Sequence, residues 1–156
     1  MYICGDERLN GYDLLDAVGR LTDTTFAIAR LFFRAQLTRF PGVTLVVSHG
    51  GGALPYALGR MRRNRAIHTE YPDPLDGFRR LYFDTALFDP RALRFLCDVA
   101  GADKVVLGSD YPFAIGDPEP RRIIDETSLT EVERRAILGE TAARIFHIDC
   151  GCPGDR

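Results

Sequence analysis

The chain has 156 residues, of which 46% are hydrophobic and 27% charged, and its formal net charge at pH 7 is -2. This length is enough for one domain with its own hydrophobic core, and the charge argues against a general binder of nucleic acid or membrane surfaces. The chain shows no apolar run long enough to span a membrane and no leader pattern at residue 1, so a cytoplasmic location is expected.

The first part of the chain is predicted to be loop followed by one helix. Residues 1–21 show no firm periodicity and favour a loop with at most one helical turn. Over residues 24–40, large apolar residues recur at helical spacing, and Pro41-Gly42 is expected to end this helix. Its predicted buried stripe consists of Phe26, Phe33, Leu37 and Phe40.

Three short apolar runs are predicted to be β-strands, and they cover residues 45–47, 81–85 and 104–107. A helix over residues 53–67 follows the first strand, and a helix from Asp89-Pro90 to Gly101 follows the second. Strands that alternate with helices through short connections form right-handed βαβ units. The sequence therefore predicts an α/β fold with a parallel sheet.

The remaining segments are less regular. Residues 68–78 are predicted to be a polar loop. A capping box fits Thr130 with Glu133 and equally Ser128 with Glu131, so the start of that helix stays open. Gly139 is expected to separate it from a last helix over residues 141–146.

Two of the predicted strands lead to side chains that can carry acid–base or metal chemistry. His49 follows the first strand and precedes three glycines, and Asp110 follows the third strand. Because the carboxyl ends of parallel strands face the region where ligands bind, we expect both side chains in one cleft, within about 8 Å. The alternatives are a structural histidine and a turn-forming aspartate. Asp84, at the end of the middle strand, either supports this site or only forms hydrogen bonds with the backbone.

Two motifs carry a resemblance to a known family. The segments His49-Gly-Gly-Gly-Ala-Leu-Pro55 and Gly108-Ser-Asp-Tyr-Pro-Phe113 resemble the amidohydrolase-related family of metal-dependent TIM barrels, and within it the aminocarboxymuconate-semialdehyde decarboxylase branch. The resemblance implies that His49 is catalytic beside a metal, and that Asp110 is both a metal ligand and a catalytic residue. It also implies that Arg60 binds a substrate carboxylate in a neighbouring subunit, and hence a homodimer.

The chain also departs from that family. The family's His-x-His strand and a further histidine ligand are absent, and His68 and His147 lie where it places no ligand, so both are predicted to be surface residues. A TIM barrel needs about 250 residues. The resemblance thus implies a partial TIM (β/α)8 barrel made of its C-terminal three βα units. Residues 1–148 would form this part of the barrel domain, and residues 149–156 a disordered tail.

The function implied by the resemblance is a metal-dependent carboxy-lyase that acts on a small unsaturated or aromatic carboxylic acid. Its cofactor would be a divalent metal, with zinc the first expectation, and no nucleic-acid or membrane partner is expected. Three alternatives stay open: a metal-dependent hydrolase of a lactone or cyclic ester, a hydratase, and a non-catalytic truncated half-barrel.

Overall fold

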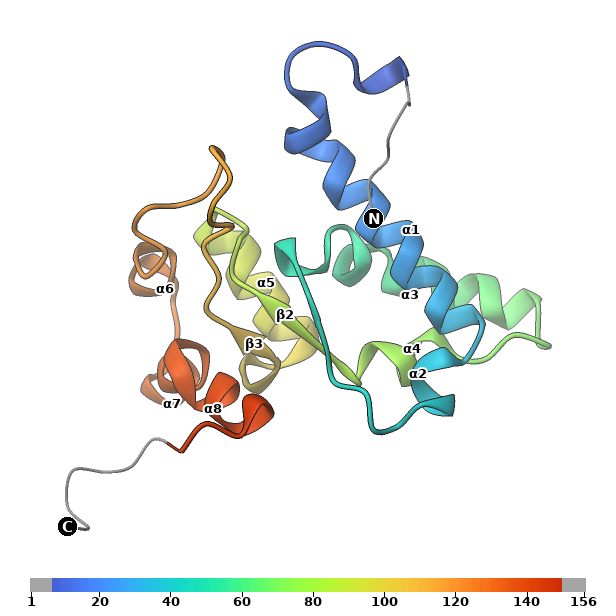
Figure 1. Cartoon of the computed structure of the whole chain (residues 1–156). Helices are drawn as coiled ribbons and strands as arrows, with labels where there is room; N and C mark the ends of the chain where they lie inside the picture. The colour runs from blue at the N-terminus through green and yellow to red at the C-terminus, as the bar shows by residue number, and fades with distance from the viewer. Residues whose placement is uncertain (1–6, 150–156) are drawn as a thin grey trace.

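Three parallel strands form the centre of the computed structural model, which describes residues 7–149 (Figure 1). The strands are β1 (Leu45–Val47), β2 (Leu81–Asp84) and β3 (Val105–Val106), and they lie in the order β1-β2-β3. Leu45 pairs with Leu81 and Phe83 with Val105, both in parallel register. The predicted α/β fold with a parallel sheet is confirmed, although β3 is shorter than expected.

Helices precede and connect these strands. The α-helices are α1 (Arg20–Phe33), α2 (Gln36–Arg39), α3 (Leu54–Ile67), α4 (Pro74–Phe78), α5 (Pro90–Ala100), α6 (Arg122–Glu126), α7 (Glu131–Arg135) and α8 (Thr141–Phe146). Short 3-10 turns cover Glu7–Leu9, His49–Gly51 and Ala102–Lys104, and π-helical turns cover Leu15–Gly19 and Ala136–Glu140. The predicted helices after β1 and β2 correspond to α3 and α5.

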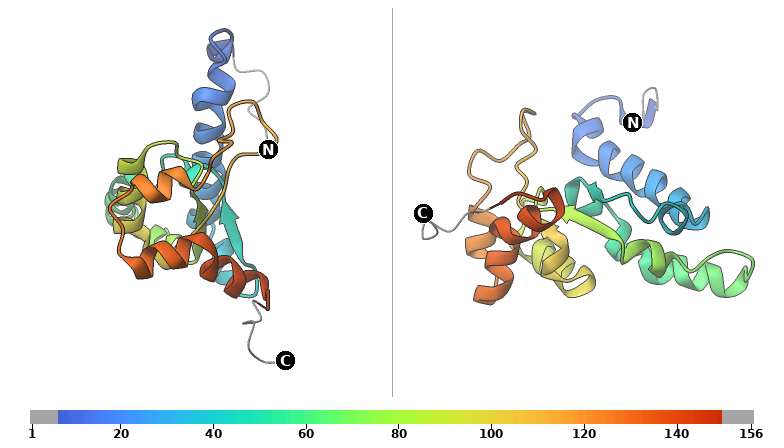
Figure 2. Two further views of the ribbon diagram at one scale, coloured as in Figure 1. Left: turned by 90° about the vertical axis from the view of Figure 1, so that its left-hand side faces the viewer. Right: turned by 60° about the horizontal axis from the view of Figure 1, so that its bottom comes forward.

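The two faces of the sheet differ in how they are covered. In β2, Leu81 and Phe83 are fully buried, whereas Tyr82 and Asp84 on the other face are only half-buried. Figure 2 shows most of the helices gathered on one side of the strands. The core therefore lies between the sheet and this helical layer, because alternate strand residues point to opposite faces.

Helix α1 differs from the predicted helix in both its ends and its buried face. It begins at Arg20 and is separated from α2 by Ala35, which has a left-handed backbone with φ of +52°. Its buried residues are Ile28 and Phe32, whereas Phe26 is 63% exposed. The predicted stripe was therefore wrong at Phe26 and also at Phe40, which is 53% exposed. The ring of Phe32 instead packs against Gly77 of α4, where a Cβ would come within 2.4 Å of it.

Three further differences concern turns and caps. The predicted loop over residues 68–78 contains α4, whose N-terminus is capped by the Asp73 side chain accepting a hydrogen bond from the Leu75 N–H (2.9 Å). Thr130 forms the capping box of α7 with Glu133, which decides between the two predicted starts. Gly139 does not end a helix, because helical backbone continues from α7 through a widened π-helical turn into α8.

Two predictions fall at the limits of the described residues. Apart from Asp149, the predicted tail over residues 149–156 lies outside them. Among residues 7–149, none of the helices has the length and apolar character that a membrane crossing requires.

Candidate active site

The loop that follows β1 positions His49. The strand ends at Val47, and His49 then adopts a left-handed backbone with φ of +57°, as do the glycines after it. A Cβ on Gly51 would lie 2.8 Å from the Phe83 ring, and one on Gly52 would lie 2.4 Å from the Leu21 carbonyl oxygen. The glycines are therefore required, since the chain turns tightly between the core and α1.

The segment after β3 brings Asp110 to the same end of the sheet. Gly108 packs directly against Asp84, because a Cβ there would lie 2.8 Å from the Asp84 Cβ. The Gly108 N–H also donates a hydrogen bond to the hydroxyl oxygen of Thr85, at 3.0 Å. Asp110 then takes a left-handed backbone with φ of +63°. Two close contacts, one with Asp84 at the end of β2 and one with Thr85 directly after it, thus fix the path of the chain just before Asp110.

His49 and Asp110 lie next to each other, as the sequence predicts. The His49 Nε2 atom is 3.7 Å from the Asp110 Oδ1 atom, and the two side chains are only 15% and 14% exposed. This separation is too long for a direct hydrogen bond, and the contact is an ion pair only when the imidazole is protonated. The His49 Nδ1 atom is buried and makes no hydrogen bond within residues 7–149. Both groups are therefore close enough to act on one small ligand.

Asp84 supports this pair from the middle strand. Its Oδ1 atom accepts hydrogen bonds from the backbone N–H groups of Gly50 (3.0 Å) and Ala86 (3.2 Å). Burial raises the pKa of the Asp84 carboxyl above its usual value, while these two N–H groups and the nearby His49 act in the opposite direction. Asp84 thus accepts hydrogen bonds from the backbone and, through the bond to Gly50, holds the loop that carries His49. The two predicted roles, hydrogen bonding to backbone and support of the site, are therefore compatible.

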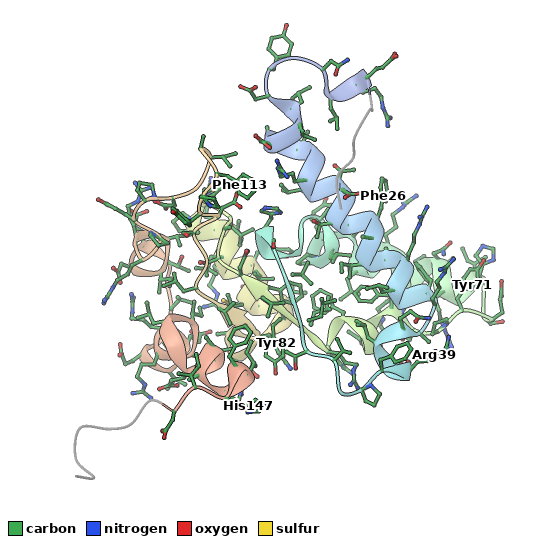
Figure 3. The ribbon with its side chains drawn as sticks, viewed as in Figure 1. Phe26, Arg39, Tyr71, Tyr82, Phe113 and His147 are labelled. Atoms are coloured by element: carbon green, nitrogen blue, oxygen red, sulfur yellow. The ribbon has the colours of Figure 1, made fainter. Side chains whose placement is uncertain are left out.

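The other residues considered from the sequence lie apart from this pair. Arg60 is exposed on α3 and forms no hydrogen bond or ion pair with any residue that the structure describes. Its role in a neighbouring subunit stays a prediction. His68 and His147 are exposed, as predicted, and Figure 3 shows His147 near the C-terminal end of the described chain.

The described residues include donors that suit a divalent metal but do not by themselves complete a site for one. A carboxylate such as that of Asp110 and an imidazole such as that of His49 are suitable donors for zinc and similar divalent metals, and the unpartnered Nδ1 of His49 leaves that ring open to a further contact. However, no group of three or more histidine, cysteine, aspartate or glutamate side chains within residues 7–149 is arranged to hold a metal ion. A complete site would therefore need ligands from outside these residues.

One contact beside the site involves a residue that the sequence did not single out. The guanidinium carbon of Arg20 lies 5.0 Å from the centre of the Phe113 ring. Phe113 follows Asp110 by three residues and belongs to the second motif, whereas Arg20 lies in the segment predicted to be loop. The predicted helix began at residue 24, whereas α1 begins at Arg20. Because Arg20 was not assigned to the helix, its side chain could not be placed beside Phe113.

Comparison with known proteins places the chain beside decarboxylases and hydratases. The family model described as Amidohydrolase matches residues 2–148. The chain is 32% identical over 153 residues to a 2-amino-3-carboxymuconate-6-semialdehyde decarboxylase of Caenorhabditis elegans, covering 92% of this chain and 38% of that protein. It is 28% identical over 137 residues to a 2-keto-4-carboxy-3-hexenedioate hydratase of Sphingobium sp., covering 81% of this chain and 40% of that protein.

Solved structures show the same fold. The 5-carboxyvanillate decarboxylase of Sphingomonas paucimobilis superposes with a TM-score of 0.78 at 27% identity, covering 91% of this chain and 45% of that chain. A dihydroxybenzoic acid decarboxylase of Polaromonas sp., solved with bound manganese and an inhibitor, gives a TM-score of 0.78 at 22% identity, with coverage of 92% and 44%. The chain thus spans less than half the length of these relatives, and the predicted partial barrel is confirmed.

Proposed function

Because the chain belongs to the amidohydrolase family, we propose that it forms the C-terminal part of a metal-dependent decarboxylase for a small unsaturated or aromatic carboxylic acid. The observation that carries this proposal is the 3.7 Å separation of the His49 Nε2 and Asp110 Oδ1 atoms at one end of a parallel sheet. The decarboxylase names among its relatives support the same reaction class.

A divalent metal, with zinc our first choice, would be held by Asp110 and by ligands from outside residues 7–149. Once bound, it would supply Lewis acidity and lower the pKa of a water molecule into the neutral range. We assign Asp84 a supporting role in this arrangement, because its Oδ1 atom accepts hydrogen bonds from two backbone N–H groups, one of them in the loop that carries His49.

His49 is the residue placed to handle the proton. Decarboxylation breaks the bond between a substrate carbon and its carboxylate, and the electron pair left on that carbon must then accept a proton. The Nε2 atom of His49 lies 3.7 Å from the Asp110 Oδ1 atom, so the two groups are close enough to act on the same proton. His49 therefore acts as the general acid, and Asp110 passes protons to and from it.

Arg60 would hold a substrate carboxylate in the site of a second copy of the chain. Its guanidinium is exposed on α3 and makes no ion pair with the described residues of its own chain. An arginine can grip a carboxylate through two parallel hydrogen bonds, a geometry that lysine does not offer. This arrangement requires a homodimer.

A hydratase is the second candidate, because one of the relatives has that activity by name. The same pair could deliver a proton while water adds to a carbon–carbon double bond. The two reactions differ in their products, since a decarboxylase releases carbon dioxide and a hydratase keeps every carbon atom.

The first experiment is elemental analysis of the purified chain, together with its mass in solution. Near-stoichiometric zinc in a dimer would support a site completed by association. A chain that binds no added zinc would contradict a working site in these 156 residues and would assign the activity to a longer protein.

The second experiment measures carbon dioxide release from carboxylated muconate and hydroxybenzoate acids by the zinc-loaded protein. His49→Asn and Asp110→Asn should each lower turnover at least about 100-fold, the range expected for general acid–base groups. The matched control His68→Asn, which alters an exposed histidine, should leave turnover unchanged. Water addition without carbon dioxide would favour the hydratase, and full activity in His49→Asn would contradict the proposed role of His49.

A further inference from the structure

The loop that carries Asp110 forms its backbone hydrogen bonds mainly within itself. Its backbone bonds run from the Phe113 N–H to the Asp110 carbonyl (3.0 Å), from the Gly116 N–H to the Phe113 carbonyl (2.9 Å) and from the Asp117 N–H to the Ser109 carbonyl (2.8 Å). Within the described chain, the recorded hydrogen bonds of residues 109–117 join no residue beyond Glu119. The position of this loop relative to the rest of the protein therefore depends on side-chain contacts.

One such contact reaches the loop from α1. The Arg20 guanidinium lies over the face of the Phe113 ring, 5.0 Å from its centre, which is within the range of a cation–π interaction. The Arg20 Nε atom also donates a hydrogen bond to Asp16 Oδ1 at 2.6 Å, which fixes the direction of the side chain. Phe113 is 46% exposed, whereas Tyr111 on the same loop is 87% exposed. Figure 3 shows Phe113 on this loop, at the end of the molecule where α1 begins.

The same end of α1 also supports the loop that carries His49. The Ala53 N–H donates a hydrogen bond to the hydroxyl oxygen of Thr25, at 2.9 Å. Gly52 approaches the Leu21 carbonyl so closely that a Cβ would lie 2.4 Å from its oxygen. The first turns of α1 thus contact the His49 loop through the Thr25 hydroxyl and the Leu21 carbonyl, and the Asp110 loop through Arg20.

We propose that Arg20 is a positioning residue of the active site, which ties the Asp110 loop to the helix that supports the His49 loop. Its contact with Phe113 keeps the two reactive side chains at their observed separation. The effect of Arg20 on catalysis rests on the proposed function, whereas the contact between Arg20 and Phe113 does not. This contact can be tested on the chain without metal or substrate, so its failure and a failure of the decarboxylase proposal are distinguishable.

The experiment is amide hydrogen exchange on the full 156-residue chain, read at the N–H groups of Phe113, Gly116 and Asp117. Arg20→Gln and Phe113→Leu should each speed exchange at these amides about two- to fivefold, the factor that an exposed cation–π contact is worth. The double variant should exchange no faster than either single variant, because both remove the same contact. Phe113→Tyr keeps an aromatic face for Arg20, so its exchange rates at these amides should equal those of the unmodified chain.

Two matched controls separate this contact from general effects of charge and side-chain loss. Arg30→Gln removes a positive charge from an exposed position of α1, and Tyr111→Leu removes an exposed ring from the same loop. Both should leave exchange at the three amides unchanged. Exchange that is unaltered by Arg20→Gln, or effects of Arg20→Gln and Phe113→Leu that multiply in the double variant, would overturn the proposal.

A kinetic measurement tests the catalytic meaning once turnover is observed. Arg20→Gln should lower kcat with little change in KM, since Arg20 acts on the Asp110 loop and not on the substrate. A raised KM with unchanged kcat would overturn the positioning role, because it would mean that Arg20 binds the substrate instead.

Discussion

Replacing Asp84 separates the role of its charge from the role of its hydrogen bonds. The carboxylate accepts hydrogen bonds from the Gly50 and Ala86 N–H groups at 3.0 and 3.2 Å, and burial raises its pKa. Asp84→Asn keeps an acceptor oxygen of the same shape and removes the buried charge. Asp84→Ala leaves both N–H groups without an acceptor.

The two variants should therefore differ in stability. Each unsatisfied buried N–H costs about 1–3 kcal/mol, so Asp84→Ala, which leaves two of them, should lower the free energy of unfolding at pH 7 by about 2–6 kcal/mol. Asp84→Asn should be neutral or slightly stabilising at pH 7, because burial is the largest influence on the pKa of this group and disfavours the ionised form.

The pH dependence follows from the direction of the pKa shift. The Asp84 pKa is higher in the folded chain than the usual 3.8, so over that interval the folded state binds more protons than the unfolded state. This carboxyl therefore makes the chain less stable as pH rises from about 3.8 through its raised folded-state pKa. Asp84→Asn should remove that slope, and near pH 3 it should be no more stable than the unmodified chain.

The assay is urea unfolding of the metal-free chain from pH 3 to pH 7, analysed by linear extrapolation. Asp98→Ala is the matched control, because its carboxylate is exposed and, within residues 7–149, pairs with Arg94 alone. Its loss should change the free energy of unfolding by less than about 1 kcal/mol. A loss in Asp84→Asn as large as that in Asp84→Ala would refute the reasoning. It would mean that the charge of Asp84 stabilises the fold.

Two other substitutions test the cap of α7 and the glycine loop. The ion pair with Arg94 and the capping box lower the pKa of Glu133 to about 2. Glu133→Gln should therefore lower the free energy of unfolding by about 1 kcal/mol at pH 7. Urea titrations should show that difference shrinking as pH falls from 4.5 to about 2, and a constant difference would contradict it. Gly52→Ala should lower the free energy of unfolding by about 2 kcal/mol or more, because its Cβ would meet the Leu21 carbonyl at a φ of +61°. Gly59→Ala, at an open helical position, should raise it by about 0.5–1 kcal/mol in the same assay, and equal effects would contradict the tight turn.

The parts of the fold that were predictable carry their signals locally. The Asp89-Pro90 pair marks the start of α5, since the aspartate caps the helix and proline tolerates the first turn. The same signal at Asp73-Pro74 marks α4, which the sequence reading overlooked because proline-rich polar segments usually form loops. The sequence therefore contained the signal for α4, and the prediction of a loop gave the prolines more weight than the capping aspartate.

Other features could not be predicted because they depend on tertiary contacts. Phe26 and Phe32 both fit an apolar helical stripe, and only the approach of α4 at Gly77 determines that Phe32 is buried. In the candidate site, strand ends and motifs were enough to predict that His49 and Asp110 lie together. The contact of Arg20 with Phe113 joins residues 93 positions apart in sequence and has no local signal.

Backbone conformation gives an independent reason to treat His49 and Asp110 as functional residues. Both have a left-handed backbone, which costs a residue with a side chain about 1–2 kcal/mol relative to the common conformations. Ala35 and His147 are also left-handed, but they lie next to helix ends, where this conformation is usual. Tyr12, Asp13 and Phe88 are left-handed as well, and their side chains are exposed. His49 and Asp110 instead follow β-strands, and each carries a mostly buried polar side chain toward the other. Strain of this kind persists when the surroundings enforce it, here through the glycines after His49 and the backbone bonds to Asp84. A glycine at either position would relieve the strain but would bring no imidazole or carboxylate to this end of the sheet, so the conformation is best explained by the chemistry of the side chains.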